Sequence, residues 1–270
     1  MRKKVLFTDI DGTLTNIVTG EYSCSKDTIE TLKQLDVPII LCSAKTMAEQ
    51  ELIRQELEII EPFVVENGGA IVLPEEYFDQ SVIPEENCER VGNYLVVQLG
   101  QPISVIREKL KALRKDSNLK FLTVGDLSVE KLSKVAHLTQ SKAMLMANRM
   151  FAETILSINK GDLPDFSRRA CSLGLRVIYG GQFVDVTGGN DKGNAVRFLI
   201  DCFRKKYGDY ITFFGIGDSP NDAPMLKEVD VPMLVQRPDK TWSSLDTKNI
   251  INLPGVGPDG LKHVLEVILE

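Results

Sequence analysis

Two aspartates, Asp9 and Asp11, lie one residue apart near the start of the chain, directly after an apolar run at residues 5–7. Alternate residues of a strand project to the same side, so the two carboxylates would share one face at the end of a strand. Like charges this close repel each other and require a cation between them. Mg²⁺ suits this position because it binds carboxylate and phosphate oxygens together. The spacing predicts a phosphoryl-transfer site, and the alternative is an Asp11–Gly12 turn that closes a hairpin.

A second acidic motif follows a predicted strand at residues 210–214. Asp218 and Asp222 lie four residues apart in a glycine-flanked loop. In a doubly wound sheet, the loops after different strands converge at the carboxyl edge, where ligands bind. Taken alone, the loop could be a turn that caps the next helix. Together with Asp9 and Asp11, it predicts four carboxylates around one crevice.

Positive and polar partners for these carboxylates stand elsewhere in the chain. Lys192 lies at the start of a predicted helix after a glycine turn, where a cation opposes the helix dipole. A surface ion pair is therefore a poor explanation for this lysine. Ser43 follows a buried strand and offers a hydroxyl and backbone amides at a helix start, where anions bind readily. Lys45 is a similar but weaker candidate.

The two ends of the chain share one pattern of secondary structure, in which short apolar strands alternate with amphipathic helices. This alternation predicts an α/β fold, a doubly wound parallel sheet covered on both faces, built from residues 1–83 and 188–270. The predicted strands are 37–42, 63–65, 70–73, 210–214 and 231–235, and the predicted helices start near Ser25, Thr46, Lys192 and Leu261.

The middle of the chain, residues 84–187, has a different pattern of predicted secondary structure. One face of a predicted helix carries Ile103, Ile106, Leu110 and Leu113, and alternating strands are predicted at 155–158 and 176–179. About 100 residues are enough for a unit with its own core. We therefore predict an inserted α+β cap domain that selects the substrate.

The composition fits a globular enzyme: 270 residues, 43% hydrophobic, 26% charged and a net charge of -6. Scattered Lys and Arg argue against a nucleic-acid partner. The first apolar run breaks at Asp9, and no stretch approaches the roughly 20 apolar residues of a membrane span, so we expect a cytoplasmic protein. The five cysteines have no Cys-x-x-Cys spacing, which favours reduced thiols. Nothing here predicts the oligomeric state.

The order of these motifs resembles the haloacid dehalogenase (HAD) superfamily of phosphotransferases, and the insert resembles the type IIB cap of its Cof-like branch. The resemblance implies that Asp9 is the nucleophile and Asp11 the general acid and base. It also implies Mg²⁺ as cofactor, bound by Asp9, the backbone carbonyl of Asp11 and Asp218. The remaining implied roles are phosphate binding by Ser43, Lys192 and Asn221, and orientation of the metal site by Asp222.

Shorter stretches resemble the mannosyl-3-phosphoglycerate phosphatase branch of that group, namely residues 43–49, 148–153 and 180–183. This implies that the partner is a glycosyl phosphoglycerate or another small phosphorylated sugar. Arg149 would pair with a carboxylate, and Glu153 would accept hydrogen bonds from sugar hydroxyls. Lys45 and Asn67 would be further substrate contacts. Thr154 stands where that branch usually has proline, and Asp185 where a histidine is expected, so a glucosyl analogue stays open. An exposed ion pair between Arg149 and Glu153 is the alternative.

Two rival functions also remain at this point. One is a sugar phosphomutase, which returns the phosphoryl group to a sugar and requires a bisphosphorylated sugar. The other is a non-catalytic phosphosugar-binding protein, although binding alone has no need of a nucleophile such as Asp9.

Overall fold

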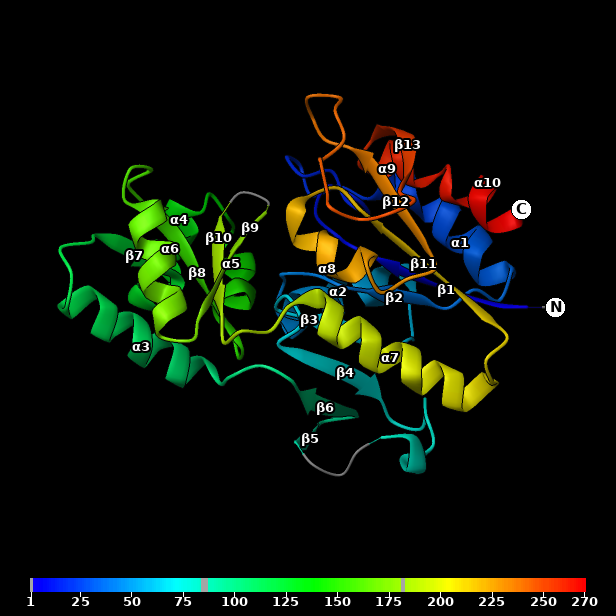
Figure 1. The fold of residues 1–270 in the computed structure, drawn as a ribbon, viewed down its shortest axis with the longest axis horizontal. Coiled ribbons are helices and arrows are strands. Elements are labelled where there is room, and N and C mark those ends of the chain that lie inside the picture. The colour runs from blue at the N-terminus through cyan, green and yellow to red at the C-terminus, as the bar shows by residue number, and fades with distance from the viewer. Residues whose placement is uncertain (1, 84–86, 181–182) are drawn as a thin grey trace.

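The computed structural model describes residues 2–83, 87–180 and 183–270. Figure 1 shows a larger body that holds both chain ends and a smaller body joined to it by two connections. The larger body is built on a parallel sheet in the order β13-β12-β11-β1-β2. Its strands are β1 (Lys3–Thr8), β2 (Ile39–Leu41), β11 (Ile211–Gly217), β12 (Val231–Gln236) and β13 (Ile251–Val256).

Both faces of this sheet are buried, and the alternation along β1 shows why. Leu6 packs into one cluster with Ile29 and Ile268, whereas Val5 and Phe7 pack into another. Successive side chains of a strand point to opposite faces, so a continuous apolar strand needs a cover on each side. The covering helices are α1 (Lys26–Gln34), α9 (Pro258–Leu261) and α10 (Val264–Leu269) on the Leu6 side, and α7 (Lys192–Tyr207) and α8 (Ala223–Leu226) on the other.

A separate antiparallel sheet in the order β3-β4-β6-β5 lies beside β2. Its strands are β3 (Phe63–Val65), β4 (Ala70–Pro74), β5 (Cys88–Val91) and β6 (Tyr94–Gln98), and α2 (Met47–Leu57) precedes it. Residues 63–65 and 70–73 are strands, as predicted, but they lie in this antiparallel sheet and not in the predicted parallel sheet. One parallel bridge, between Cys42 and Val64, joins β3 to the end of β2. The short turn from Glu66 to Gly69 allows only a hairpin, because a parallel crossover needs a dozen or more residues.

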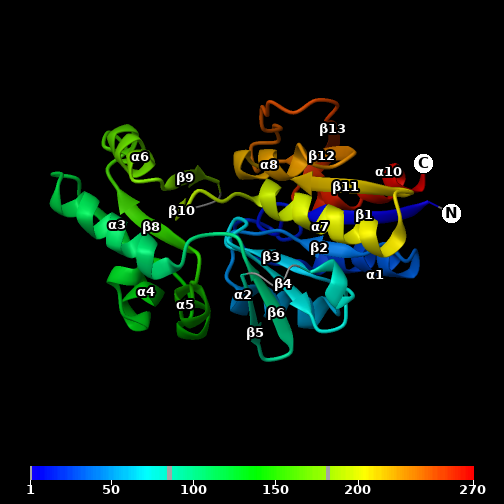
Figure 2. The same cartoon turned by 60° about the horizontal axis from the view of Figure 1, so that its bottom comes forward.

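The smaller body is an α+β unit around an antiparallel sheet in the order β7-β8-β10-β9. Ile106 and Phe166 share a core with the sheet, whereas Leu132, Ala143 and Met146 form a second cluster. Figure 2 shows α4 and α5 on the opposite side of the sheet from α6. The elements are α3 (Ile103–Lys115), β7 (Phe121–Thr123), α4 (Val129–Val135), α5 (Gln140–Ala147), β8 (Ala152–Ile158), α6 (Leu163–Ser172), β9 (Arg176–Tyr179) and β10 (Val184–Thr187).

The predicted α/β core with an inserted α+β unit is confirmed, but the pairing of the strands suggests a different start for the insert. The predicted boundary, residue 84, lies outside the described residues. β5 and β6 pair with β4 on the core side, so we propose that the cap begins after Gln98. β10 ends at Thr187, which suits the predicted end of the insert.

One local detail differs from the sequence prediction. The last helix, α10, starts at Val264 and not near Leu261, which ends the separate short helix α9. Ser25 directly precedes α1, as predicted, and its hydroxyl donates to the carbonyl oxygen of Leu14 at 2.6 Å. Four 3-10 turns complete the fold: η1 (Ser23–Ser25), η2 (Gln80–Val82), η3 (Val124–Asp126) and η4 (Pro220–Asp222).

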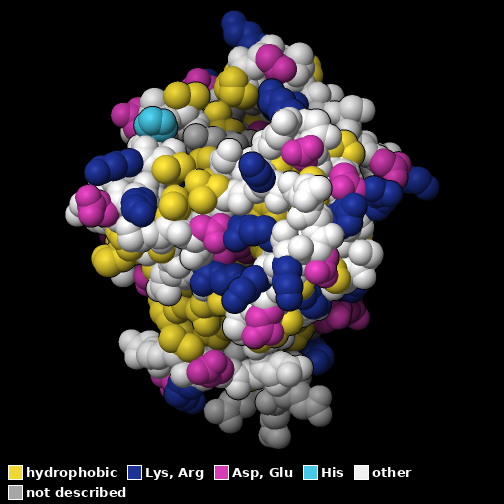
Figure 3. Space-filling view, turned by 90° about the vertical axis from the view of Figure 1, so that its left-hand side faces the viewer, with side chains coloured by type: hydrophobic (Ala, Val, Ile, Leu, Met, Phe, Trp, Pro, Cys, Tyr) yellow, Lys and Arg dark blue, Asp and Glu magenta, His cyan; other side chains and the backbone are white. Residues whose placement is uncertain are grey.

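The surface carries mixed charge on the face at the cap end, where basic and acidic side chains alternate over short distances (Figure 3). In the part of the chain that the structure describes, no helix combines the length and apolar character needed to cross a membrane.

Candidate active site

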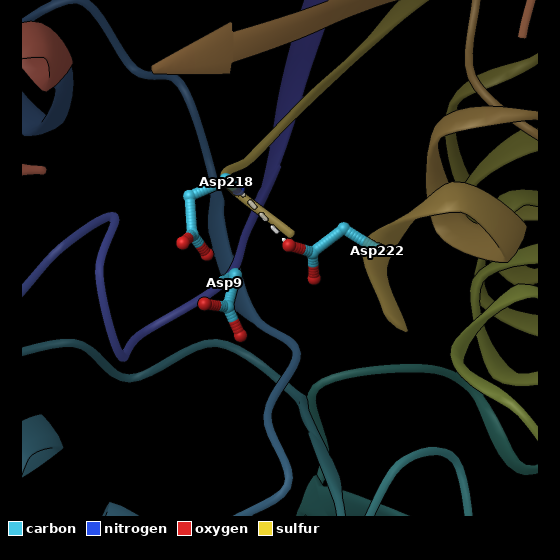
Figure 4. A group of neighbouring side chains, drawn as sticks. All are labelled: Asp9, Asp218 and Asp222. Carbon is cyan, nitrogen blue, oxygen red and sulfur yellow. Dashed lines mark hydrogen bonds between the residues drawn. The ribbon is translucent and has the colours of Figure 1, made fainter. Parts of the chain in front are cut away.

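Asp9, Asp218 and Asp222 form a buried carboxylate cluster at the carboxyl edge of the parallel sheet. Asp9 follows β1 and Asp218 follows β11, and these strands pair with Thr8 opposite Ile216. Their loops therefore start side by side. One oxygen from each of the three carboxylates lies within 4.8 Å of the others, and Figure 4 shows the Asp218 and Asp222 carboxylates pointing toward the position of Asp9.

Two glycines allow the carboxylates to come this close to the backbone. Gly12 has φ +87°, and a Cβ atom built on it would lie 2.8 Å from Oδ2 of Asp218. A Cβ atom on Gly217 would lie 2.5 Å from Oδ2 of Asp222. Real side chains avoid such contacts, so glycine is required at both positions.

Lys192 is the cation inside this cluster. Its Nζ lies 2.6 Å from Oδ1 of Asp9 and 2.7 Å from Oδ1 of Asp222, and its side chain is fully buried. Burial lowers the pKa of Lys192, but Asp222 and Asp9 raise it by more, so the ammonium keeps its charge. The other oxygen of Asp222 accepts hydrogen bonds from the backbone N–H groups of Asp218 and Ser219.

Two of these carboxylates, Asp9 and Asp218, have raised pKa values. Burial raises the pKa of Asp9 well above its usual range, although Lys192 opposes that effect. Burial and the Asp222 charge together raise the pKa of Asp218 to about 7. Three acidic groups thus share one lysine, and the hard oxygen donors and surplus negative charge fit a divalent cation such as Mg²⁺.

Asp11 lies outside the carboxylate cluster and faces the cavity between the core and the cap. Its side chain is 38% exposed, and Oδ2 lies 2.9 Å from Nζ of Lys45. Asp9 and Asp11 thus have different surroundings, one buried with Lys192 and the other at the cavity wall. The backbone contact from Asp11 to a metal stays a prediction.

The cavity has a volume of about 430 Å³ and is lined by both bodies of the fold. Ser43, buried just after β2, lies in its wall, and its hydroxyl accepts the backbone N–H of Lys45 at 3.2 Å. The cavity also has an apolar part formed by both bodies. Its polar lining includes Asp9, Asp11, Ser43, Lys45, Arg149, Thr154, Asp185 and Asn221, and its apolar lining includes Ile17, Val18, Leu52, Ile53, Leu138, Leu145, Met146 and Phe183.

Arg149 and Glu153 have different positions, so the alternative of an exposed ion pair between them was wrong. Arg149 is buried at the cavity, with Nη2 3.9 Å from Oδ1 of Asp185. Its Nε and Nη1 have no hydrogen-bond partner among the described residues. Glu153 is buried behind the cavity lining, and its carboxylate accepts Nε of Arg107 at 2.6 Å. Its predicted substrate contact stays a prediction.

Asn67 connects the loops around the site. Its backbone N–H donates to the carbonyl of Ser43 at 2.9 Å, and its carbonyl accepts Nδ2 of Asn190 at 3.2 Å. Its side-chain amide donates to Oδ2 of Asp185 at 2.9 Å, and its Oδ1 lies 3.5 Å from Nδ2 of Asn221. Asn67, Lys192 and Asn221 also line a smaller cavity of about 180 Å³. Of the stretch 180–183, residues 181 and 182 lie outside the described residues.

Glu66, which directly follows β3, was not predicted as a site residue. Its buried carboxylate accepts the backbone N–H groups of Met150, Phe151 and Ala152 at 2.9, 2.8 and 2.7 Å. These residues lead into β8, so a core side chain holds the first residues of a cap strand. The available signal was a charged residue between two fully apolar strands, because a buried charge requires partners.

The chain also resembles known proteins over nearly its whole length. A phosphatase of Methanococcoides burtonii, named for glucosyl-3-phosphoglycerate and mannosyl-3-phosphoglycerate, is 36% identical over 97% of this chain and 96% of its own. The mannosyl-3-phosphoglycerate phosphatase of Pyrococcus horikoshii is 38% identical over 86% of this chain and 90% of its own.

Solved structures show the same fold. A Thermoplasma acidophilum protein superposes with a TM-score of 0.66 at 17% identity, with all of both chains covered. A sugar phosphatase of HAD subclass IIB superposes with a TM-score of 0.63 at 17% identity, over 98% of this chain and 99% of its own. The sequence model of haloacid dehalogenase-like hydrolases matches residues 6–241. The chain therefore belongs to the haloacid dehalogenase-like hydrolase family, as its motif order predicted.

Proposed function

We propose that this protein is a Mg²⁺-dependent phosphatase that releases phosphate from glucosyl-3-phosphoglycerate or mannosyl-3-phosphoglycerate through an aspartyl-phosphate intermediate. The observation that carries the proposal is the buried Asp9–Lys192 pair, beside Asp218 and Asp222, under a cavity shared with the cap. Binding alone would not require a nucleophilic carboxylate in such a position. The names of relatives 34–38% identical support the choice of substrate.

Asp9 is the nucleophile in this proposal. One of its carboxylate oxygens attacks the phosphorus, and the bond from phosphorus to the ester oxygen of the substrate breaks. Asp11, in the cavity wall beside Lys45, donates a proton to the departing oxygen. Water then attacks the phosphorus of the aspartyl phosphate, Asp11 takes its proton, and free Asp9 and inorganic phosphate result.

Charge neutralisation makes that attack feasible. A carboxylate and a phosphate oxygen about 4 Å apart repel each other by about 4 kcal/mol per charge pair at an effective dielectric constant of about 20. Lys192 offsets part of this repulsion from within the cluster. Asp9 and Asp218 would hold Mg²⁺ in this proposal, while Asp222 contacts Lys192 and the backbone of the Asp218 loop. When bound, Mg²⁺ stabilises the charge that develops on the phosphoryl oxygens.

Arg149 supports a substrate with a carboxylate as well as a phosphate. Its buried guanidinium lies in the cap wall of the cavity that Asp9 also lines. A guanidinium binds a carboxylate with two parallel hydrogen bonds, and Nε and Nη1 of Arg149 have no partner among the residues described. Reorientation of this side chain on substrate binding would satisfy those donors with the glycerate carboxylate.

Phosphate release from a panel of esters tests the proposal. The panel contains glucosyl- and mannosyl-3-phosphoglycerate, hexose phosphates and phosphoglycolate, each with Mg²⁺ and with EDTA. We expect strong preference for a glycosyl phosphoglycerate, dependence on Mg²⁺, and loss of release in Asp9→Asn. Comparable weak release from every ester would contradict the substrate assignment. A requirement for a bisphosphorylated sugar would instead identify a mutase.

A further inference from the structure

We propose that Asp185 is a specificity-determining residue that accepts a hydrogen bond from one hydroxyl of the sugar. This inference rests on the proposed function, because it concerns the glycosyl part of the same substrate. Asp185 lies on β10 of the cap and lines the 430 Å³ cavity together with Thr154, its partner across the strands. Its carboxylate therefore lies in the cap wall of the cavity in which the proposed substrate would bind.

The Asp185 carboxylate is held firmly in place. Oδ1 accepts the hydroxyl of Thr154 at 2.5 Å, and Oδ2 accepts the side-chain amide of Asn67 at 2.9 Å. Arg149 contributes positive charge 3.9 Å from Oδ1. Thr154 thus acts through Asp185, as a positioning residue. A proline at position 154 could not supply this hydroxyl, so Thr154 and Asp185 form one functional pair.

The carboxylate keeps capacity for a further donor. An ionised carboxylate offers about four lone-pair sites, and the described contacts of Asp185 use two of them. A hydroxyl of a sugar bound in the 430 Å³ cavity could donate this further hydrogen bond. A buried charged acceptor discriminates strongly, because a substrate that lacks the hydroxyl leaves the carboxylate unpaired.

Asn67 links this recognition to the phosphate site. The same residue contacts Asp185 through its amide, Ser43 through its backbone N–H and Asn221 through Oδ1. These contacts join the cap to both loops that face the phosphoryl group. Asn67 therefore fixes the Asp185 carboxylate relative to the loops of the phosphate site, which makes it a second positioning residue.

Deoxy substrates provide the test. Values of kcat/KM for the preferred glycosyl phosphoglycerate and for its 2-, 3-, 4- and 6-deoxy analogues are measured in the wild type and in Asp185→Asn, which keeps the size of the side chain. We expect one deoxy analogue to lose about 10- to 100-fold in the wild type and almost nothing further in Asp185→Asn. Thr154→Val should reduce the same discrimination partly. Asp165→Asn, on α6 outside the cavity lining, is the matched control and should retain the wild-type discrimination.

A purely structural role for Asp185 would lower kcat/KM for the parent and all deoxy analogues by one common factor, which would overturn the inference. Wild-type discrimination that persists in Asp185→Asn would overturn it as well. If the wild-type enzyme releases phosphate from neither glycosyl phosphoglycerate, the proposed function fails together with the inference. If the wild-type enzyme releases phosphate efficiently and Asp185→Asn discriminates among the deoxy analogues as the wild type does, only the role of Asp185 is rejected.

Discussion

Lys192 is the residue on which the buried charge of the site depends. It contacts Asp9 and Asp222 directly, and Asp218 belongs to the same cluster. Removal of one partner from a buried ion pair typically costs about 3–5 kcal/mol, because the other charges stay buried without compensation. We predict a loss of this size in the free energy of unfolding for Lys192→Met, measured by urea denaturation in EDTA.

The matched control for that variant is Lys227→Met. Lys227 forms an exposed pair with Asp246 at 3.3 Å, and such surface pairs contribute less than about 1 kcal/mol. Equal losses in the two variants would show that the Lys192 pairs contribute no more than a surface pair.

Asp218 should contribute less to the stability of the metal-free protein as the pH rises from its ordinary pKa of 3.8 to about 7. The pKa of Asp218 is about 7 in the folded protein, above its ordinary value of 3.8 in an unfolded chain. Between these values the folded state binds more protons than the unfolded state, so this contribution falls as pH increases. Mg²⁺ competes with that proton, so the Tm increase caused by Mg²⁺ should grow from pH 5 to pH 8. An equal Mg²⁺ effect at both pH values would contradict this linkage.

Removal of the charge of Asp11 should mainly lower kcat, whereas removal of the charge of Asp218 should mainly lower the Mg²⁺ affinity. General acid–base groups contribute about 10²–10⁴-fold to rate, and we predict a loss of kcat in this range for Asp11→Asn. Mg²⁺ affinity, measured by calorimetry, should change little in this variant, because the Asp11 carboxylate pairs with Lys45 outside the cluster. In Asp218→Asn the Mg²⁺ affinity should fall sharply. The reverse pattern would exchange the two roles.

At the scale of elements, Glu66 fixes the start of β8 through hydrogen bonds to backbone N–H groups. Three backbone N–H groups of residues 150–152 would lose their acceptor in Glu66→Ala. An unsatisfied buried donor costs about 1–3 kcal/mol, and relaxation offsets part of the sum, so we predict a loss of about 3–5 kcal/mol and faster amide exchange at these residues. Glu130→Ala removes an exposed cap carboxylate beside Lys134 and should cost less than about 0.5 kcal/mol. Unchanged exchange at residues 150–152 would contradict the role of Glu66.

In the turn that contains Glu66, the backbone of Gly68 lies very close to the backbone of Asp191, just before α7. Gly68 has φ +84°, and a Cβ atom there would lie 2.0 Å from the carbonyl oxygen of Asp191. Gly92 has φ +58° with open space around it, so Gly92→Ala measures the backbone strain alone, about 1–2 kcal/mol. We predict that Gly68→Ala loses at least about 2 kcal/mol more, since a clash with fixed backbone adds to the strain. Equal melting temperatures would exclude this clash.

The elements that follow local chemical rules could be predicted from the sequence. Asp9 and Asp218 each follow an apolar strand, and adjacent parallel strands bring such loops together. Lys192 starts a helix after a glycine turn, where its side chain has a short path to both loops. Residues 63–65 and 70–73 were predicted as strands, but their separate antiparallel sheet was not, because apolar strands look alike in either orientation and only the length of the turn between them distinguishes the two.

At the scale of the whole molecule, the cavity depends on how the cap lies against the core. The contacts of Asn67 with Asp185, of Glu66 with residues 150–152 and of Thr46 with Leu145 all join residues far apart in the chain. Periodicity along a sequence carries no information on such pairings. The resemblance of residues 148–153 therefore predicts Arg149 as a substrate residue, but the sequence could not reveal that Glu153 pairs with Arg107 behind the cavity.

The most direct test of the central claim is to trap the reaction on Asp9. Single-turnover mixtures of the enzyme, Mg²⁺ and glucosyl- or mannosyl-3-phosphoglycerate are quenched in acid, and the phosphorylated peptide is mapped by mass spectrometry. The account predicts transient phosphate on Asp9 that forms and decays at rates consistent with turnover, and none in Asp9→Asn. Turnover of the substrate without phosphate on Asp9, or wild-type turnover by Asp9→Asn, would contradict it.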